Sequence, residues 1–264
     1  MEPTLAPTSR ASRGHLVASS LNLAFGGLAV LRSVSVTVEP LLATGIIGLN
    51  GSGKTSLLNC INGVYRPQSG TVALDGVDLT RLSSHRRTAL GIARTFQHNE
   101  APREQRAIDY VMLGCYPLRH RAGATFAGLG LSWIKGLERT DRERAEQAIA
   151  QAKLPDLGDS LVGELPYGII KRLDLARALA SSPRLLLLDE PAAGLSTEER
   201  LELTGVLKGL KAEGQTLCLI EHDMSLIAGV CDRILVMSSG EKVADGPAKE
   251  VMNDPEIRDA FLGE

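Results

Sequence analysis

The glycine-rich segment from Gly48 to Thr55 constrains the fold of this chain more than any other stretch of the sequence. It reads GLNGSGKT and matches the pattern GxxxxGK[ST], a phosphate-binding turn that follows a strand and opens a helix. The flanking residues fit that context. Gly45–Gly48 predicts a short apolar strand, and Lys54–Asn62 has leucine and isoleucine at helical spacing and stops at Gly63. The sequence therefore predicts a strand, a phosphate loop and a helix in succession.

The predicted phosphate loop indicates ATP and Mg²⁺ as ligands. Backbone N–H groups turn inward at the start of the helix and form a nest for anionic phosphate groups. Lys54 is expected to reach the β- and γ-phosphates, and the Thr55 hydroxyl is expected to ligate Mg²⁺. We expect the nucleotide to contact a run of consecutive residues: Gly48, Leu49, Asn50, Gly51, Ser52, Gly53, Lys54, Thr55 and Ser56.

Two carboxylates suited to ATP hydrolysis follow a second apolar run. Asp189 and Glu190 come directly after Leu185–Leu188. Asp189 is expected to hold Mg²⁺, directly or through water, and Glu190 to act as the general base on the attacking water. Taken alone, such an Asp-Glu pair is more typical of a solvated helix cap. Its combination with the phosphate loop favours the catalytic interpretation.

A histidine follows the next apolar run along the chain. Only Glu221 separates Leu217–Ile220 from His222. Because ligand sites lie at the carboxyl ends of parallel strands, His222 is expected to bond the γ-phosphate or to orient the attacking water. A lone histidine in such a place is usually structural, so both readings stay open.

Two further residues are candidates by position. Gln97 carries a neutral side chain suited to contact metal and water and to sense the γ-phosphate, although an ordinary loop glutamine is the alternative. Phe25 precedes two glycines and lies upstream of the phosphate loop, where it is suited to stack on adenine. A core phenylalanine is the alternative for Phe25.

The pattern of elements predicts an α/β fold with a mostly parallel sheet. Continuous apolar runs at Leu185–Leu188 and Leu217–Ile220 are typical of parallel strands buried on both faces. A capping box, Ser196 with Glu199, opens a helix between them that Gly214 closes.

Other parts of the chain predict additional layers. Ser33–Val38 alternates with period two, and Thr71–Leu74 leads into an Asp-Gly turn, which together indicate an antiparallel sheet. Residues 98–164 predict a helical insertion in which a second capping box, Thr140 with Glu143, opens a helix. We expect residues 1–19 to be a flexible lead and residues 20–264 to form one domain.

Composition excludes several other classes of protein. The 29 Lys and Arg residues nearly balance the 31 Asp and Glu residues, giving a formal net charge of −2, which argues against a dedicated nucleic-acid binder. The uncharged, largely apolar stretch that looks most like a membrane segment, Ala122–Ile134, is shorter than the roughly 20 residues that span a bilayer. The four cysteines form no CxxC or Cys/His pattern, so scattered free thiols are expected rather than a zinc or redox site.

The order of these motifs resembles that of the ATP-binding cassette family, the ATPase subunits of ABC transporters, from about Leu21 to Glu264. The most diagnostic segment is LPYGIIKRLDLARAL, Leu165–Leu179, which looks like the family signature. The resemblance implies a P-loop NTPase fold with a RecA-like, mostly parallel sheet core, an N-terminal antiparallel β subdomain and an inserted helical subdomain.

The resemblance also implies roles for individual residues. In that family the signature of one subunit caps the ATP held by another, so Tyr167 and Gly168 are expected to contact ATP across a head-to-tail dimer. Gln97 matches the Q-loop, His222 the switch histidine and Phe25 the adenine-stacking loop. The sequence departs from the family at Pro166 and Ile169, where a serine and a glutamine are common, which puts full activity of the signature in doubt.

Four short segments are most similar to the ATPases of branched-chain amino acid importers, with amide and urea importers close behind: Arg94–His98, Asp189–Leu195, Ile220–Met224 and Phe261–Glu264. This resemblance implies transmembrane permease subunits and a second ABC ATPase as partners, a hetero- or homodimer of ATPases, and a solute-binding protein that acts indirectly. It implies a cytoplasmic protein, peripheral on the inner face of the membrane. The alternatives are a soluble ABC-type ATPase without a permease, such as an iron–sulfur assembly scaffold, and an exporter ATPase.

Overall fold

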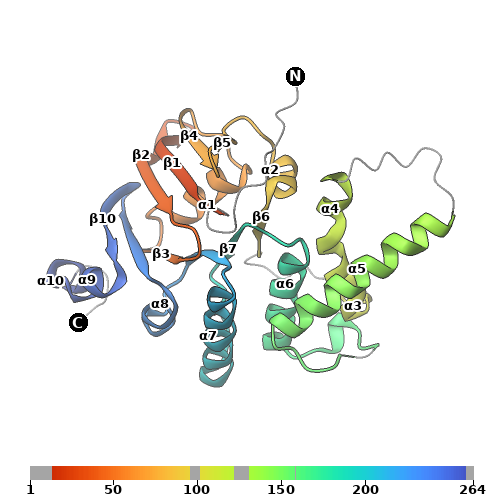
Figure 1. Ribbon diagram of the computed structural model, residues 1–264. Coiled ribbons are helices and arrows are strands. Elements are labelled where there is room, and N and C mark those ends of the chain that lie inside the picture. Colours follow the sequence, from red (N-terminus) through yellow and green to blue (C-terminus); the bar gives the residue numbers. More distant parts are fainter. Residues whose placement is uncertain (1–13, 96–101, 122–130, 158, 260–264) are drawn as a thin grey trace.

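The computed structural model describes residues 14–95, 102–121, 131–157 and 159–259 (Figure 1). Its strands are β1 (Leu16–Phe25), β2 (Leu28–Val38), β3 (Ala43–Gly48), β4 (Ser69–Leu74), β5 (Val77–Asp78), β6 (Ile92–Arg94), β7 (Leu185–Asp189), β8 (Thr216–Ile220), β9 (Arg233–Ser238) and β10 (Glu241–Pro247).

The helices lie between and after these strands. They are α1 (Lys54–Asn62), α2 (Ser84–Leu90), α3 (Ala107–Met112), α4 (Tyr116–Arg121), α5 (Leu131–Gln151), α6 (Tyr167–Ala180), α7 (Thr197–Ala212), α8 (Met224–Val230), α9 (Ala248–Asn253) and α10 (Pro255–Ile257), with 3₁₀ turns η2 (Leu113–Cys115) and η3 (Val162–Glu164). Among the described residues, no helix combines the length and apolar character needed to cross a bilayer.

The larger sheet has the strand order β10-β9-β3-β8-β7-β6. The strands from β9 to β6 in that order are parallel, and β10 runs antiparallel to β9. All residues of β7 and β8 are buried, as parallel strands covered on both faces must be. The predicted mostly parallel sheet, with Leu185–Leu188 and Leu217–Ile220 inside it, is confirmed.

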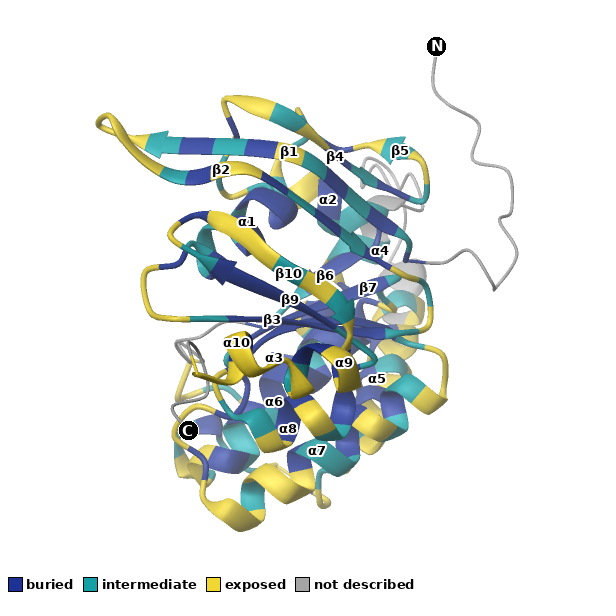
Figure 2. Cartoon of the chain, turned by 90° about the vertical axis from the view of Figure 1, so that its left-hand side faces the viewer, coloured by how far each residue is buried: buried dark blue, intermediate teal, exposed yellow. Residues whose placement is uncertain are grey.

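A smaller antiparallel sheet with the order β2-β1-β4-β5 lies over the phosphate-loop side of the larger one. Helix α1 lies between the two sheets (Figure 2), and its Leu57, Leu58 and Ile61 pack into a core that both sheets share. The predicted antiparallel sheet and the helix Lys54–Asn62 are confirmed. This packing fixes the start of α1 against the ends of the parallel strands.

Helices α6, α7 and α8 cover the opposite face of the larger sheet, where a second core forms (Figure 2). Helix α7 begins at the predicted capping box. The Ser196 hydroxyl accepts from the Glu199 N–H at 3.2 Å, and the Glu199 carboxylate accepts from the Ser196 N–H at 2.8 Å. The box satisfies N–H groups that the first turn of a helix leaves unpaired.

The expected flexible lead over residues 1–19 is wrong at its end, because β1 begins at Leu16. Leu16 and Ala18 are buried, and so are Leu21 and Leu23. The strand pairing is irregular between Ala18 and Leu21, and Ser20 has a φ of 49°. This irregularity shifts the apolar positions by one residue, so the alternation of period two does not extend back to Leu16.

Most of the helical layer at the right of Figure 1 falls within the expected insertion, residues 98–164. It comprises α3, η2, α4 and α5, and α6 packs on both α3 and α5. The helical layer therefore continues past Glu164 into α6, which carries the segment that resembles the family signature.

The predicted capping box at Thr140 and Glu143 is wrong, because both residues lie inside α5. The Thr140 hydroxyl donates to the Gly136 carbonyl at 3.1 Å, and the Glu143 carboxylate accepts from Arg139 at 3.0 Å. Both contacts join residues four apart on one helix face. A threonine and a glutamate three residues apart fit a helix interior as well as a helix start.

Candidate active site

The phosphate loop joins β3 to α1, as the sequence predicts. Gly53 precedes α1 with a φ of 98°, in the left-handed region that side chains disfavour. At Gly48, a Cβ atom would lie 2.2 Å from the Met237 carbonyl oxygen, so β9 packs directly on the loop. Glycine is therefore required at both positions for the loop to adopt this path.

The remaining residues of the phosphate loop differ in their exposure to solvent. Leu49, Asn50 and Gly51 are exposed at the tip of the loop, and Thr55 and Ser56 are half-buried at the start of α1. The buried Ser52 hydroxyl has no hydrogen-bond partner among the described residues. An unpaired buried hydroxyl is costly, and an anion bound in the loop would supply an acceptor.

Lys54 is buried within the loop. Its ammonium donates to the carbonyls of Gly48 at 2.8 Å and Leu49 at 2.9 Å. Burial lowers the pKa of Lys54, while the negative charges of Glu190 and Asp189 act in the opposite direction. The structure thus brings together the cation of the loop and the two carboxylates at the end of β7, Asp189 and Glu190.

Asp189 ends β7 and is almost completely buried. Its Oδ2 accepts from the Arg94 guanidinium at 2.7 Å, and the two side chains are 1% and 10% exposed. Its Oδ1 is buried and has no partner within the described part of the chain. Mg²⁺ binds carboxylate oxygens, so an unpaired buried Oδ1 beside a phosphate loop fits a metal ligand.

Glu190 and His222 meet at the carboxyl ends of neighbouring strands. Asp189 pairs with Ile220 in the β7–β8 register, which places the residues that follow them side by side. The distance between His222 Nε2 and Glu190 Oε1 is 2.9 Å. Glu190 has a φ of 48°, a strained conformation for a residue with a side chain. Such strain is often found at catalytic positions and here turns Glu190 toward His222.

Glu221 is a site residue that the sequence analysis missed. Its carboxylate, in a residue that is 3% exposed, accepts from the backbone N–H of Ala192 at 2.6 Å and of His222 at 3.0 Å. Burial raises the pKa of Glu221, although its bonds to backbone N–H groups act in the opposite direction. Glu221 therefore ties the loop after β7 to the backbone of His222.

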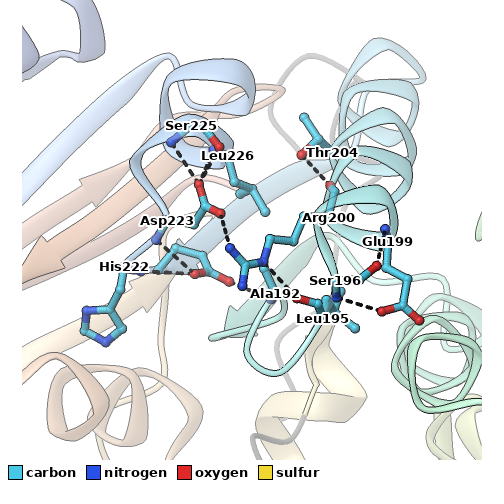
Figure 3. Close-up of polar contacts among 11 residues, drawn as sticks. Ala192, Leu195, Ser196, Glu199, Arg200, Thr204, His222, Asp223, Ser225 and Leu226 are labelled. Atoms are coloured by element: carbon cyan, nitrogen blue, oxygen red, sulfur yellow. Dashed lines mark hydrogen bonds and ion pairs between the residues drawn. The ribbon is translucent and has the colours of Figure 1, made fainter.

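A second connection joins the same two loops through the start of α7. Arg200 donates to the Leu195 carbonyl at 3.0 Å and to the Asp223 carboxylate at 3.3 Å, as Figure 3 shows. The other Asp223 oxygen caps α8 by accepting from the N–H groups of Ser225 and Leu226. Asp223, which directly follows His222, is therefore fixed to α7 through one carboxylate oxygen and to the start of α8 through the other.

Phe25 lies at the end of β1, next to the turn of the β1–β2 hairpin. It is 48% exposed, and its ring meets the Tyr65 ring edge-on with centroids 5.1 Å apart. Phe25 is thus not a core residue, and a largely exposed aromatic face is suited to stacking on a base.

The signature segment opens α6, with Pro166 at the N-cap and Tyr167 in the first turn. Tyr167 is 47% exposed, and its hydroxyl donates to the Ala193 carbonyl at 3.4 Å. Gly168 is buried, and a Cβ atom there would lie 2.2 Å from Glu199 Oε1. Contact of these two residues with a nucleotide on a second subunit stays a prediction. Gln97 lies outside the described residues.

Comparisons with known proteins agree with this geometry. The profile of the ABC transporter family matches residues 31–193. The chain is 35% identical to the high-affinity branched-chain amino acid transport ATP-binding protein BraF of Pseudomonas aeruginosa, over 96% of this chain and 99% of BraF. It is 34% identical to the corresponding LivG protein of Escherichia coli, over 94% of this chain and 98% of LivG.

A solved structure supports the same assignment. The ADP conformation of an ATP-binding cassette of an ABC transporter superposes with a TM-score of 0.80 and 28% identity, covering 95% of this chain and 99% of the other. A family profile that covers more than half of the chain and full-length relatives above 30% identity agree with the phosphate loop and the paired carboxylates. The chain therefore belongs to the ABC transporter family, as one of its ATP-hydrolysing cassettes.

Proposed function

We propose that this chain is the ATP-hydrolysing subunit of an importer for branched-chain amino acids. The observation that carries the proposal is the 2.9 Å contact between Glu190 and His222 at the sheet edge that also receives the phosphate loop. A carboxylate held next to an imidazole beside a phosphate site is suited to activate water. The solute is proposed from the similarity to BraF and LivG.

The proposed chemistry begins with ATP seated in the phosphate loop. Lys54, which donates to two loop carbonyls, would instead donate to phosphate oxygens. Glu190 would accept a proton from water as that water bonds to the γ-phosphorus. The bond from the γ-phosphorus to the bridging oxygen then breaks and yields ADP and phosphate. His222 would hold the Glu190 carboxylate in place and orient the water.

Mg²⁺, when bound, would neutralise charge on the β- and γ-phosphates. The residues that would hold it are Thr55, Gln97 and Asp189. The buried, unpaired Oδ1 of Asp189 supports this assignment.

The proposed partners are transmembrane permease subunits and a second ATPase that faces this one, with a solute-binding protein acting through the permease. The chain would then be cytoplasmic and peripheral on the inner face of the membrane. Its signature would cap the partner's ATP through Tyr167 and Gly168.

Reconstitution tests this proposal. Proteoliposomes that contain the chain, its permease subunits and the solute-binding protein are loaded with ATP and given radiolabelled leucine, an amide or urea. We expect ATP-dependent leucine uptake that stops in the matched Glu190→Gln variant. ATP hydrolysis without uptake of any of these solutes, or ATP-driven movement outward, would contradict the importer assignment and favour the soluble ATPase or the exporter.

A further inference from the structure

Arg94 connects two elements that carry proposed magnesium ligands. It ends β6, and its guanidinium donates to Asp189 Oδ2 at 2.7 Å and to Asn59 Oδ1 at 2.5 Å. Asp189 ends β7, whereas Asn59 lies on α1. One planar cation therefore joins the phosphate-loop helix to the strand that ends in the metal-binding carboxylate.

The position of Asn59 relates this contact to Thr55. Residues four apart on a helix lie on the same face, one turn from each other. Asn59 is four residues after Thr55 on α1. Asn59 and Thr55 therefore lie on one face of α1, so a contact that fixes Asn59 lies one turn from the Thr55 hydroxyl.

Asp189 is held through one of its two carboxylate oxygens. Arg94 occupies Oδ2, while Oδ1 is buried and has no partner among the described residues. A carboxylate fixed through one oxygen presents the other in a set direction. Second-shell partners of this kind orient metal ligands, and their loss typically weakens metal binding about 10–100-fold.

We propose that Arg94 is a positioning residue for the magnesium site: it sets the separation of α1 from β7 and turns Asp189 so that Oδ1 faces the metal. This inference rests on the proposed function. Arginine suits the role because its guanidinium is always charged and offers two N–H directions in one plane. Lysine would keep the charge but would not hold Asp189 and Asn59 in the same fixed geometry.

The test measures metal binding directly. Mn²⁺ is titrated by electron paramagnetic resonance into the full chain with a non-hydrolysable ATP analogue, and binding of the same analogue is measured separately in EDTA. For Arg94→Ala we expect Mn²⁺ affinity to fall by about tenfold or more, with analogue binding in EDTA within twofold of the parent. For Arg94→Lys and Asn59→Leu we expect smaller losses, about threefold to tenfold.

Arg184→Ala is the matched control, because it also removes an arginine–aspartate pair, with Asp75 at 3.1 Å, away from the phosphate loop. It should leave Mn²⁺ affinity within twofold. If Arg94→Ala does not unfold cooperatively, Arg94→Lys and Asn59→Leu decide the question. Unchanged Mn²⁺ affinity in the folded variants would overturn the inference. So would a loss of analogue binding in EDTA as large as the loss of Mn²⁺ affinity. Absence of Mn²⁺ binding in the parent would overturn the proposed site as well.

Discussion

Replacing Glu221 with alanine should destabilise the protein and slow hydrolysis together. The change leaves three backbone N–H groups without their acceptor: that of buried Ala192 and, more weakly held or more exposed, those of His222 and Asp223. Each unpaired group costs about 1–3 kcal/mol. Removal of a carboxylate whose burial raises its pKa offsets part of that loss. The net expectation is a loss of about 2–4 kcal/mol in the free energy of unfolding.

Urea unfolding measures that loss, and steady-state ATP hydrolysis measures the second effect. Because Glu221 anchors the backbone of His222, we expect kcat to fall about tenfold or more, since small displacements of catalytic groups are costly. Glu221→Gln should lie between the parent and the alanine variant, because one end of the amide still accepts while its NH₂ faces an N–H donor. Glu104→Ala, at an exposed glutamate, is the control. A loss below about 1 kcal/mol with unchanged kcat would refute the reasoning.

Two further predictions concern titratable groups. The pKa of Asp223 is lowered, first by its hydrogen bond from Ser225, so its stabilising contribution is present above its unfolded pKa and is lost as pH falls through the folded value. The difference in unfolding free energy between the parent and Asp223→Asn should therefore shrink below about pH 4 in acid titrations. Burial raises the pKa of Cys60 to about 11 and of Cys218 to about 12, and all four cysteines are buried and form no disulfide. Native protein at pH 8 should thus resist a thiol reagent that labels four cysteines in urea; rapid labelling without urea would show that the interior opens.

The sequence predicts features that depend on neighbouring residues. The glycines of the phosphate loop, the spacing on α1 and the apolar run of β7 each carry their own local signal. The start of β1 carries no such signal, because an irregularity after Ala18 breaks its alternation. Thr140 and Glu143 give a misleading signal, because the spacing of a capping box also fits a helix interior.

The missed site residues are those whose partners are distant in the chain. Arg94 contacts a carboxylate 95 residues away, and Glu221 accepts from an N–H 29 residues away. Both lie in segments that resemble the family, Arg94–His98 and Ile220–Met224, but no nearby residue indicates the distant partner, so only the fold reveals the role of each side chain. The local feature that indicates a buried anchoring carboxylate at Glu221 is weak: an acidic residue between an apolar strand and a histidine.

We propose that Glu190 is the general base and that His222 holds its carboxylate in place. The direct measurement is a single-turnover assay with γ-labelled ATP on Glu190→Gln, beside a binding titration of the same variant. The substitution keeps the size of the side chain and removes its basicity. We predict ATP affinity within about twofold of the parent and hydrolysis slower by about 10²–10⁴-fold. Hydrolysis within a few-fold of the parent would contradict the assignment.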